Sequence, residues 1–119
     1  MIGGEGALGA PVWVNISART GSIGDNGLGG WYSYRVMKAG LNQFTKTLSC
    51  ELGRKGVTVI SYHPGTVDTD LSRKFVKGVD PAKLFSPDQA AAYMLAVIQG
   101  LKETDNGTFV DFAGKPIPW

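Results

Sequence analysis

The sequence lacks the features of a secreted, metal-binding or membrane-spanning protein. It has one cysteine, Cys50, and one histidine, His63, which exclude an internal disulfide and the cluster of Cys and His ligands of a structural zinc site. No stretch reaches the roughly 18 unbroken apolar residues of a membrane span, and the start at Met1 has neither the basic nor the apolar segment of a signal peptide. We therefore expect a cytoplasmic protein without a membrane partner.

Charged side chains are also few. Asp, Glu, Lys and Arg make up 18% of the 119 residues and hydrophobic residues make up 43%, whereas an ordinary soluble domain has roughly 25% charged residues. The formal charge of +2 comes without a cluster of Lys and Arg, which a nucleic-acid surface would need. The length allows one core. We expect a single core-rich unit that does not bind nucleic acid.

Short apolar runs alternate with helical patterns along the chain. Three runs rich in β-branched or aromatic residues predict strands over 12–16, 57–62 and 108–112. A helix is predicted over 31–54, between the first two strands. Its apolar residues recur every three or four positions: Met37, Leu41, Phe44, Leu48 and Leu52. Strand, helix and strand in this order predict a parallel pair with a right-handed crossover.

A second helix is predicted after an irregular or weakly helical segment, residues 66–85. Ser86, Pro87 and Gln89 form a helix start in which the serine caps, the proline takes the first position and the glutamine reaches back. The helix should run to about Leu101. Its predicted core-facing stripe is Ala91, Met94, Leu95, Ile98 and Leu101. The order β-α-β-α-β indicates an α/β fold, part of a Rossmann-like, doubly wound parallel sheet.

The N-terminal letters Gly4-Glu5-Gly6-Ala7-Leu8-Gly9 match the G-x-G-x-x-G pattern of dinucleotide-binding loops. That pattern binds a pyrophosphate only where it follows a strand and opens a helix. No strand is expected before Gly3, and a strand rather than a helix is expected after Pro11. Glu5 would also place a carboxylate beside the phosphates. We therefore interpret this segment as a flexible N-terminal loop.

Tyr34 and Lys38 lie four residues apart at the start of the first predicted helix, so they share one face. An ammonium group beside a phenol favours the phenolate and lowers the pKa of the tyrosine toward the range in which a general acid or base works. A carbonyl group that accepts a hydride needs such a proton donor. The same spacing also fits two surface residues without a function, and the surrounding motifs decide between the two interpretations.

Three motifs accompany this pair: Asn15-Ile16-Ser17 at a strand end, a glycine-rich loop over 21–30, and Pro64-Gly65-Thr66-Val67-Asp68-Thr69 after the next strand. A glycine-rich loop at the C-terminal end of a strand lies where open α/β sheets bind ligands. Together these features resemble the C-terminal half of the short-chain dehydrogenase/reductase superfamily. The residues of these motifs are similar to those of its C-factor/sniffer-like carbonyl reductase branch, and the similarity runs from about Val12 to Trp119.

The resemblance implies an oxidoreductase that moves a hydride between NAD(P)(H) and a carbonyl or alcohol substrate, without indicating whether NAD or NADP is preferred. Tyr34 would be the general acid/base, and Lys38 would lower its pKa and bind the nicotinamide ribose. The implied cofactor contacts are Tyr34, Lys38, Pro64, Gly65, Val67 and Thr69. Residues 70–85 would form a mobile segment that folds over the substrate. The helix over 31–54 would lie at a homodimer or tetramer contact.

Two features depart from the family pattern. Ala18 stands where the family usually carries a substrate-orienting serine, directly after the residue that matches Ser17. Ser17 or Ser22 could replace it, but strand alternation turns Ser17 to the opposite side from residue 18. The family's first four strands, with the glycine-rich cofactor loop and a catalytic asparagine, have no counterpart before Val12. The chain is therefore interpreted as the C-terminal half of such a domain, without the dinucleotide-binding half.

Two functions remain open on these grounds. The first is an enzyme, an NAD(P)-dependent carbonyl reductase or alcohol dehydrogenase in its full-length form. The second is an inactive fragment or pseudo-enzyme that acts through subunit association, since the first strand would have an unpaired edge. A third interpretation, a small independent β-α-β binding domain, leaves the Tyr34 and Lys38 spacing unexplained.

Four other residues attract notice without a clear role. His63 has no nucleophile or second ligand nearby in the sequence. Cys50 is expected to be a small buried residue rather than a reactive thiol. Trp31 and Tyr32 are expected to line the mouth of the pocket or to pack at the helix start.

Overall fold

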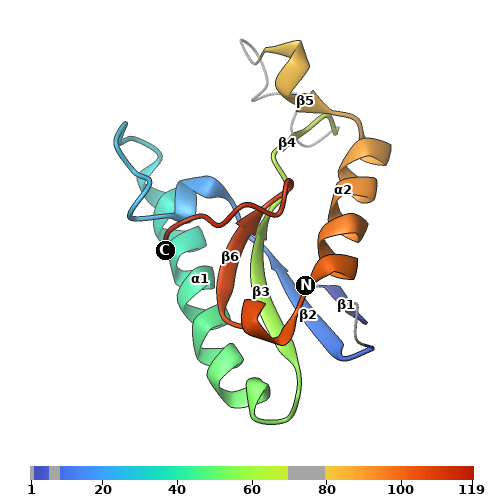
Figure 1. The fold of residues 1–119 in the computed structure, drawn as a ribbon. Helices are drawn as coiled ribbons and strands as arrows, with labels where there is room; N and C mark the ends of the chain where they lie inside the picture. The colour runs from blue at the N-terminus through green and yellow to red at the C-terminus, as the bar shows by residue number, and fades with distance from the viewer. Residues whose placement is uncertain (1, 6–8, 70–79) are drawn as a thin grey trace.

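The computed structural model describes residues 2–5, 9–69 and 80–119. A four-stranded sheet lies at its centre in the order β1-β2-β3-β6, with α1 on one face and α2 on the other (Figure 1). The bounds of these elements are β1 Ile2–Glu5, β2 Pro11–Ile16, α1 Tyr32–Gly53, β3 Thr58–His63, α2 Pro87–Gly100 and β6 Thr108–Asp111. Among the described residues, no helix is both long and apolar enough to cross a membrane.

The three predicted strands are parallel neighbours in the structure. Trp13 pairs with Val59, and Ser61 pairs with Phe109. One long helix lies in each crossover, α1 between β2 and β3 and α2 between β3 and β6. The predicted β-α-β-α-β order and the α/β class are therefore confirmed. Because parallel strands end on the same side of a sheet, the segments that follow β2 and β3 meet at one edge.

The N-terminal segment differs from its prediction. Residues 2–5 form β1, which pairs antiparallel with β2 from Ile2 opposite Val14 to Glu5 opposite Pro11. The prediction of a flexible loop is therefore wrong for residues 2–5. The prediction that this edge of β2 is unpaired is also wrong, because β1 pairs with it. Extended backbone can pair with the open N–H and C=O groups at the edge of β2 whatever its side chains are. This glycine-rich segment lacks the alternation of apolar and polar residues from which a strand is predicted. The prediction that the G-x-G-x-x-G segment does not open a helix is confirmed, because strand β2 follows it. Residues 6–8 lie outside the described part.

Helix α2 covers an apolar face of the sheet. Ile98 of the helix and Leu101 directly after it are buried, with Met94 and Val97 packed beside them. The strand residues in this core are Val12, Val14, Ile60, Tyr62 and Val110. The predicted stripe is right for Met94, Ile98 and Leu101 and wrong for Ala91 and Leu95, which are exposed, Leu95 by 58%. An alanine-rich helix offers several apolar stripes, and contact with the strands selects among them.

The start of α2 matches its prediction. Ser86 accepts a hydrogen bond on Oγ from the backbone N–H of Gln89 at 3.2 Å, and the side chain of Gln89 accepts one from the backbone N–H of Ser86 at 3.0 Å. Pro87 follows the cap at the first helical position. This capping box satisfies two of the backbone donors that a helix start leaves open.

Helix α1 turns small polar side chains to the sheet and leaves its apolar stripe only partly covered. Asn42, Thr45 and Ser49 are buried, whereas Met37 and Phe44 of the predicted stripe are 59% and 54% exposed. The other residues of this apolar stripe, Leu41, Leu48 and Leu52, are half-buried, so the helical spacing is confirmed and the polar stripe is the one that packs most closely on the sheet.

The reason lies in the strands beneath α1. Asn15, Ser17 and Ser61 are buried there, and Asn15 and Ser61 both bond to Thr45 of the helix. Polar strand residues favour the polar stripe of the helix. Cys50, expected to be buried, is exposed for the same reason.

The described residues between β3 and α2 include two short strands that the prediction of an irregular or weakly helical segment did not contain. These strands, β4 Thr66–Val67 and β5 Leu84–Phe85, pair in parallel. A short 3-10 turn, Pro81–Lys83, precedes β5. Most of the expected mobile segment, residues 70–79, lies outside the described residues.

Candidate active site

The candidate site forms where β2 ends and α1 begins. Tyr34 lies in the first turn of α1 and is 38% exposed. Lys38, one turn later, donates from Nζ to the carbonyl oxygen of Ile16 at 3.2 Å, and Nζ lies 5.8 Å from the centre of the Tyr34 ring. A side chain at Gly21 would place its Cβ 2.7 Å from Cβ of Lys38, so glycine allows the loop to lie against the helix. The predicted pair is thus held together at the carboxyl end of β2.

Arg35 ties the glycine-rich loop to the start of α1. Its guanidinium donates to the carbonyl oxygens of Gly30 at 2.9 Å, Gly29 at 3.2 Å and Thr20 at 3.3 Å. Five N–H groups in a planar fork suit this arrangement of several acceptors. The loop predicted from the sequence is therefore attached to the turn of helix that carries Tyr34. Arg35 was missed, although its place directly after Tyr34 was a usable signal.

Both serines near Ala18 are engaged elsewhere. Ser17 is buried and donates from Oγ to Oδ1 of Asn42 at 2.7 Å. Ser22 is also buried, and its hydroxyl donates to the carbonyl oxygen of Pro118. Ala18 is half-buried in extended backbone, with φ −153° and ψ 149°. These bonds leave neither hydroxyl in the role that a serine at position 18 would have.

A second cluster joins the ends of β2, β3 and β6. The backbone N–H of Arg19 donates to Nδ1 of His63 at 3.1 Å, and the guanidinium pairs with Asp111 at 3.3 Å and Asp25 at 3.5 Å. Burial, and then the charge of Arg19, lower the pKa of His63 to about 4, against the opposite influence of Asp111 and Asp25. His63 is therefore neutral at pH 7 and acts as an acceptor. Local sequence patterns do not reveal this role of His63, because its partner Arg19 lies 44 residues away.

The stretch after β3 is fixed by aromatic packing. Pro64 to Thr69 are half-buried. Gly65 has φ 77°, and a Cβ there would lie 2.6 Å from the ring of Phe85 and 3.0 Å from that of Phe112. These two rings contact each other edge-on, with centres 4.8 Å apart. Both backbone conformation and packing therefore require glycine at position 65, and the turn that the resemblance assigns to the cofactor is rigidly supported.

Tyr62 provides a contrast to Tyr34. It is 1% exposed, and its hydroxyl has no hydrogen-bond partner within the described part of the chain. Burial and the nearby charge of Asp111 raise the pKa of Tyr62 to about 12. This phenol stays protonated and closed to solvent, so it belongs to the core and Tyr34 is the accessible phenol at the end of β2.

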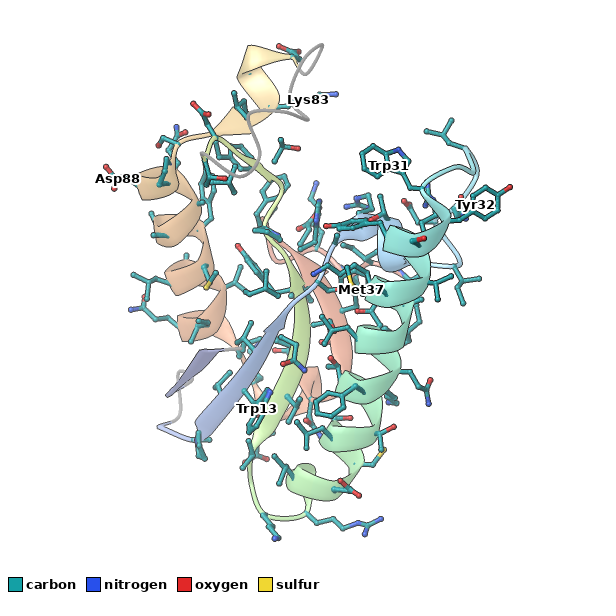
Figure 2. All side chains as sticks on the ribbon, turned by 180° about the vertical axis from the view of Figure 1, so that it is seen from behind. Trp13, Trp31, Tyr32, Met37, Lys83 and Asp88 are labelled. Atoms are coloured by element: carbon teal, nitrogen blue, oxygen red, sulfur yellow. The ribbon has the colours of Figure 1, made fainter. Side chains whose placement is uncertain are left out.

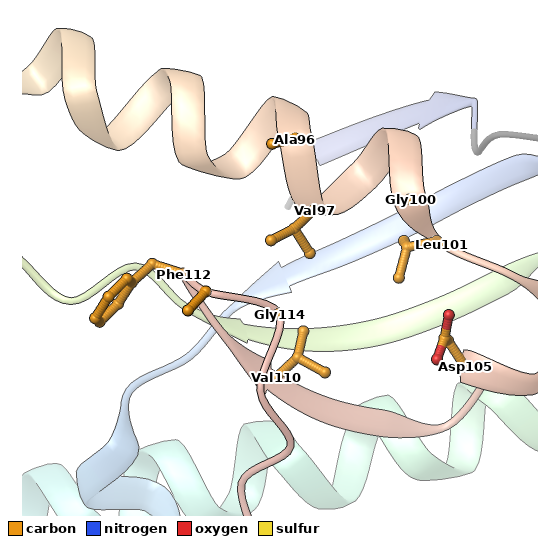
Figure 3. A pocket seen from close by; sticks show the side chains of 9 residues that line it. Ala96, Val97, Gly100, Leu101, Asp105, Val110, Phe112 and Gly114 are labelled. Atoms are coloured by element: carbon orange, nitrogen blue, oxygen red, sulfur yellow. The ribbon is translucent and has the colours of Figure 1, made fainter.

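A cavity of about 280 Å³ lies between α2 and β6 (Figure 3). Its lining includes Val97, Leu101, Asp105, Val110, Phe112 and Gly114. None of the residues predicted for catalysis or cofactor contact lines it. The cavity meets the candidate site only at Phe112, which also packs against Gly65.

Comparison with known proteins defines the class. Residues 12–80 match the short chain dehydrogenase family. The parallel sheet, the loop after β2 and the Tyr34 and Lys38 pair are in the order that the resemblance implied. The chain belongs to the short chain dehydrogenase family.

Two curated relatives have similar sequences. The chain is 37% identical over 105 residues to C-signal of Myxococcus xanthus, with 88% of this chain and 59% of that protein covered. It is also 37% identical over 104 residues to 1-hydroxy-2-glutathionyl-2-methyl-3-butene dehydrogenase of Rhodococcus sp. (strain AD45), with 87% and 45% covered. The chain thus spans about half the length of these relatives.

Two solved structures have the same fold. Carbonyl reductase Sniffer of D. melanogaster superposes with a TM-score of 0.78 at 33% identity, over 91% of this chain and 41% of that one. NADPH-bound carbonyl reductase from chicken fatty liver superposes with a TM-score of 0.79 at 33% identity, over 91% and 42%. The likeness confirms the resemblance to short-chain dehydrogenases and the partial Rossmann-like fold.

Proposed function

We propose that this chain is the part of an NAD(P)-dependent oxidoreductase that holds the nicotinamide and the substrate, with Tyr34 as the general acid/base of a carbonyl or alcohol reaction. The observation that carries the proposal is the Tyr34 and Lys38 pair at the carboxyl end of β2. A carbonyl group that accepts a hydride develops negative charge on its oxygen, and a nearby hydroxyl can neutralise it by giving a proton. The Lys38 ammonium adds positive charge beside that phenol.

The residues present fit the nicotinamide end of a dinucleotide. An ammonium group has three N–H donors, and the carbonyl oxygen of Ile16 accepts one from Lys38, so further donors can reach the hydroxyl groups of a ribose. Thr69 offers a hydroxyl, and Pro64, Gly65 and Val67 offer backbone at the adjoining strand end. When bound, the nicotinamide supplies or accepts the hydride. The family membership and the NADPH bound to the chicken reductase support this cofactor class.

The chain's own residues move the proton and orient the substrate. The Tyr34 hydroxyl hydrogen-bonds the substrate oxygen, gives it a proton during reduction and takes the proton back during oxidation. Ala18 gives no second hydrogen bond to that oxygen, so orientation by this chain depends on Tyr34.

The proposal is tested by following NADPH and NADH consumption with a panel of aldehydes and ketones. Tyr34→Phe keeps the ring and removes the proton, so we expect turnover to fall by a factor of about 10² to 10⁴. Tyr32→Phe, an equally mild change at the next-but-one position, is the matched control and should keep activity. Unchanged turnover in Tyr34→Phe, or no turnover by a chain that circular dichroism shows to be folded, would contradict the proposal.

Cofactor binding is measured separately, by fluorescence titration of NADPH and NADH into the same protein. Lys38→Met removes the ammonium while keeping most of the side-chain volume. We expect it to weaken binding of both dinucleotides, and the ratio of the two wild-type affinities gives the preference. Equal affinity in wild type and Lys38→Met would remove Lys38 from the cofactor site.

Subunit association is a second candidate function, favoured by the outer face of α1. Met37 and Phe44 on this face are more than half exposed, and Leu41 and Leu48 continue the same stripe. A second copy of the chain would cover this stripe in a homodimer or tetramer. Phe44→Glu should then lower the mass measured by light scattering, whereas Lys102→Glu, remote on the surface, should not. A monomeric wild-type protein would contradict this function.

A further inference from the structure

Trp31 has a strained backbone beside Tyr34. Its φ of 56° and ψ of 39° lie in the left-handed region, which residues with a Cβ rarely adopt. Gly29 and Gly30 before it have φ 71° and 72°. The indole is 61% exposed, and its centre lies 6.1 Å from that of the Tyr34 ring, with the planes at 67°. Three consecutive left-handed residues thus present an exposed aromatic ring next to the candidate proton donor.

Arg35 holds this turn in place. Besides its bonds to the carbonyl oxygens of Gly29, Gly30 and Thr20, its backbone N–H donates to the carbonyl oxygen of Trp31 at 2.8 Å. The carbonyl groups of Gly29, Gly30 and Trp31 are therefore all bonded to Arg35 of α1. These hydrogen bonds hold the stretch of backbone that carries the Trp31 side chain.

The helix start does not itself require a tryptophan. Ser, Thr, Asp, Asn and Gly are the residues that favour a position before a helix, and the Trp31 side chain makes no capping hydrogen bond. Glycine would also relieve the left-handed backbone. The neighbouring Tyr32, 84% exposed, projects to the opposite side of the helix start from Trp31 (Figure 2). What distinguishes Trp31 is the place of its ring beside Tyr34.

We propose that Trp31 is a specificity-determining residue that selects carbonyl compounds with a flat aromatic group on the carbonyl carbon, and that Arg35 is the positioning residue that holds it. The inference rests on the proposed function, in which the Tyr34 hydroxyl bonds the substrate oxygen. A substituent on that carbonyl carbon then lies within reach of the indole. Aromatic rings favour edge-to-face or offset contact at roughly 4.5–7 Å between centres, whereas a puckered saturated ring has no π face to offer.

The test compares two ketones, acetophenone and 1-cyclohexylethanone, which differ in having a flat or a puckered ring. The chain is labelled with 5-fluorotryptophan, so its three tryptophans, Trp13, Trp31 and Trp119, give fluorine NMR signals that single Trp→Phe variants assign. We expect acetophenone to move the Trp31 signal saturably, with an affinity roughly three- to tenfold above that of 1-cyclohexylethanone. Trp13 and Trp119 should not move. Equal affinities, or an unmoved Trp31 signal, would overturn the inference.

Variants separate the ring from its support. Arg35→Met should shift the Trp31 signal in the absence of ketone and reduce the difference between the two ketones, and Arg35→Lys should restore neither. Tyr32→Leu, the matched loss of an exposed aromatic ring, should leave both affinities unchanged. A ketone difference that survives Arg35→Met would remove Arg35 from the proposal.

The same readout distinguishes failure of this inference from failure of the proposed function, because it needs neither cofactor nor turnover. A selective shift of the Trp31 signal without any turnover would support the aromatic site and contradict the proposed reaction. Turnover that depends on Tyr34 but runs equally fast with both ketones would support the reaction and overturn the role of Trp31.

Discussion

The two long helices cover opposite faces of the same sheet with different chemistry. Helix α2 and the residue after it bury Ile98 and Leu101 against apolar strand residues. Helix α1 buries Asn42, Thr45 and Ser49, and Thr45 accepts hydrogen bonds from Asn15 and Ser61 while donating to the carbonyl oxygen of Leu41 at 3.0 Å. An apolar contact gains free energy in proportion to area and tolerates sliding, whereas a hydrogen-bonded contact depends on direction.

The polar contact belongs to the helix that carries the candidate chemistry. Tyr34 and Lys38 work only if α1 has one register on β2, because Nζ of Lys38 must reach the strand end. A network in which each donor has one acceptor penalises any other register, since a shifted helix leaves buried polar groups unpaired. Directional hydrogen bonds therefore fix the place of the candidate site on the α1 side, whereas apolar contact holds the α2 side.

The largest expected loss of stability follows truncation on the α2 side. Ile98→Ala removes a buried side chain from the core and leaves a cavity, so we expect the free energy of unfolding to fall by about 2–4 kcal/mol. Leu95→Ala on the same helix, 58% exposed, is the matched control and should cost less than about 0.5 kcal/mol. Urea denaturation measures both. Equal losses of stability in the two variants would mean that α2 turns a different face to the sheet.

Removing the hub of the α1 network should have the next largest effect. Thr45→Val keeps the shape but leaves the Asn15 amide and the Ser61 hydroxyl without their acceptor, at a cost of about 1–3 kcal/mol in the free energy of unfolding. Adding Ser61→Ala removes one orphaned donor and should recover part of that loss. If the double variant is as unstable as the sum of the two single variants, the network is not coupled.

The same comparison shows which features the sequence predicts. Strand order, the Ser86 cap and the pairing of Tyr34 with Lys38 follow from local patterns, because period, capping and spacing act within a few residues. The face of α1 that packs on the sheet cannot be predicted from such local patterns, because its polar stripe is buried only as a result of the polar residues in the strands beneath it. Strand β1 carries glycines and no alternation. The bond from Arg19 to His63 joins residues far apart in sequence, which no local pattern contains.

His63, at the end of β3, makes the stability of the folded chain sensitive to acid. Its pKa is lowered from 6.5 to about 4 in the folded chain, so the unfolded chain takes up a proton first as the pH falls. Stability from this group is full above pH 6.5, declines between about 6.5 and 4 and is then constant, with a total loss on the order of 2 kcal/mol after screening by solvent. His63 is the single histidine, so one NMR signal reports its pKa.

His63→Asn is the control for this titration. The asparagine Oδ1 can replace Nδ1 as the acceptor for the N–H of Arg19, and the amide does not titrate in this range. The decline in stability between pH 6.5 and 4 should therefore become smaller in His63→Asn than in the wild type. A normal pKa at His63 would mean that the imidazole is not buried beside Arg19 in solution.

The smallest expected effect on stability, and an informative one for the site, comes from Ala18→Ser. Residue 18 is half-buried in extended backbone, so an added hydroxyl should change the free energy of unfolding by less than about 0.5 kcal/mol. If the substrate oxygen lies between residue 18 and Tyr34, the new hydrogen bond strengthens as charge develops on that oxygen, and kcat/KM should rise about tenfold.

Ser17→Ala is the matched change one residue earlier. The Ser17 hydroxyl is bonded to Asn42, so its removal should lower stability by about 1 kcal/mol and leave kcat/KM nearly unchanged. Of these two neighbouring positions after β2, position 18 is thus expected to act on the reaction and position 17 on the fold. If Ala18→Ser leaves kcat/KM unchanged while Tyr34→Phe abolishes it, the substrate approaches Tyr34 from a direction that does not pass residue 18, and the loop that carries Trp31 becomes the remaining wall of the site.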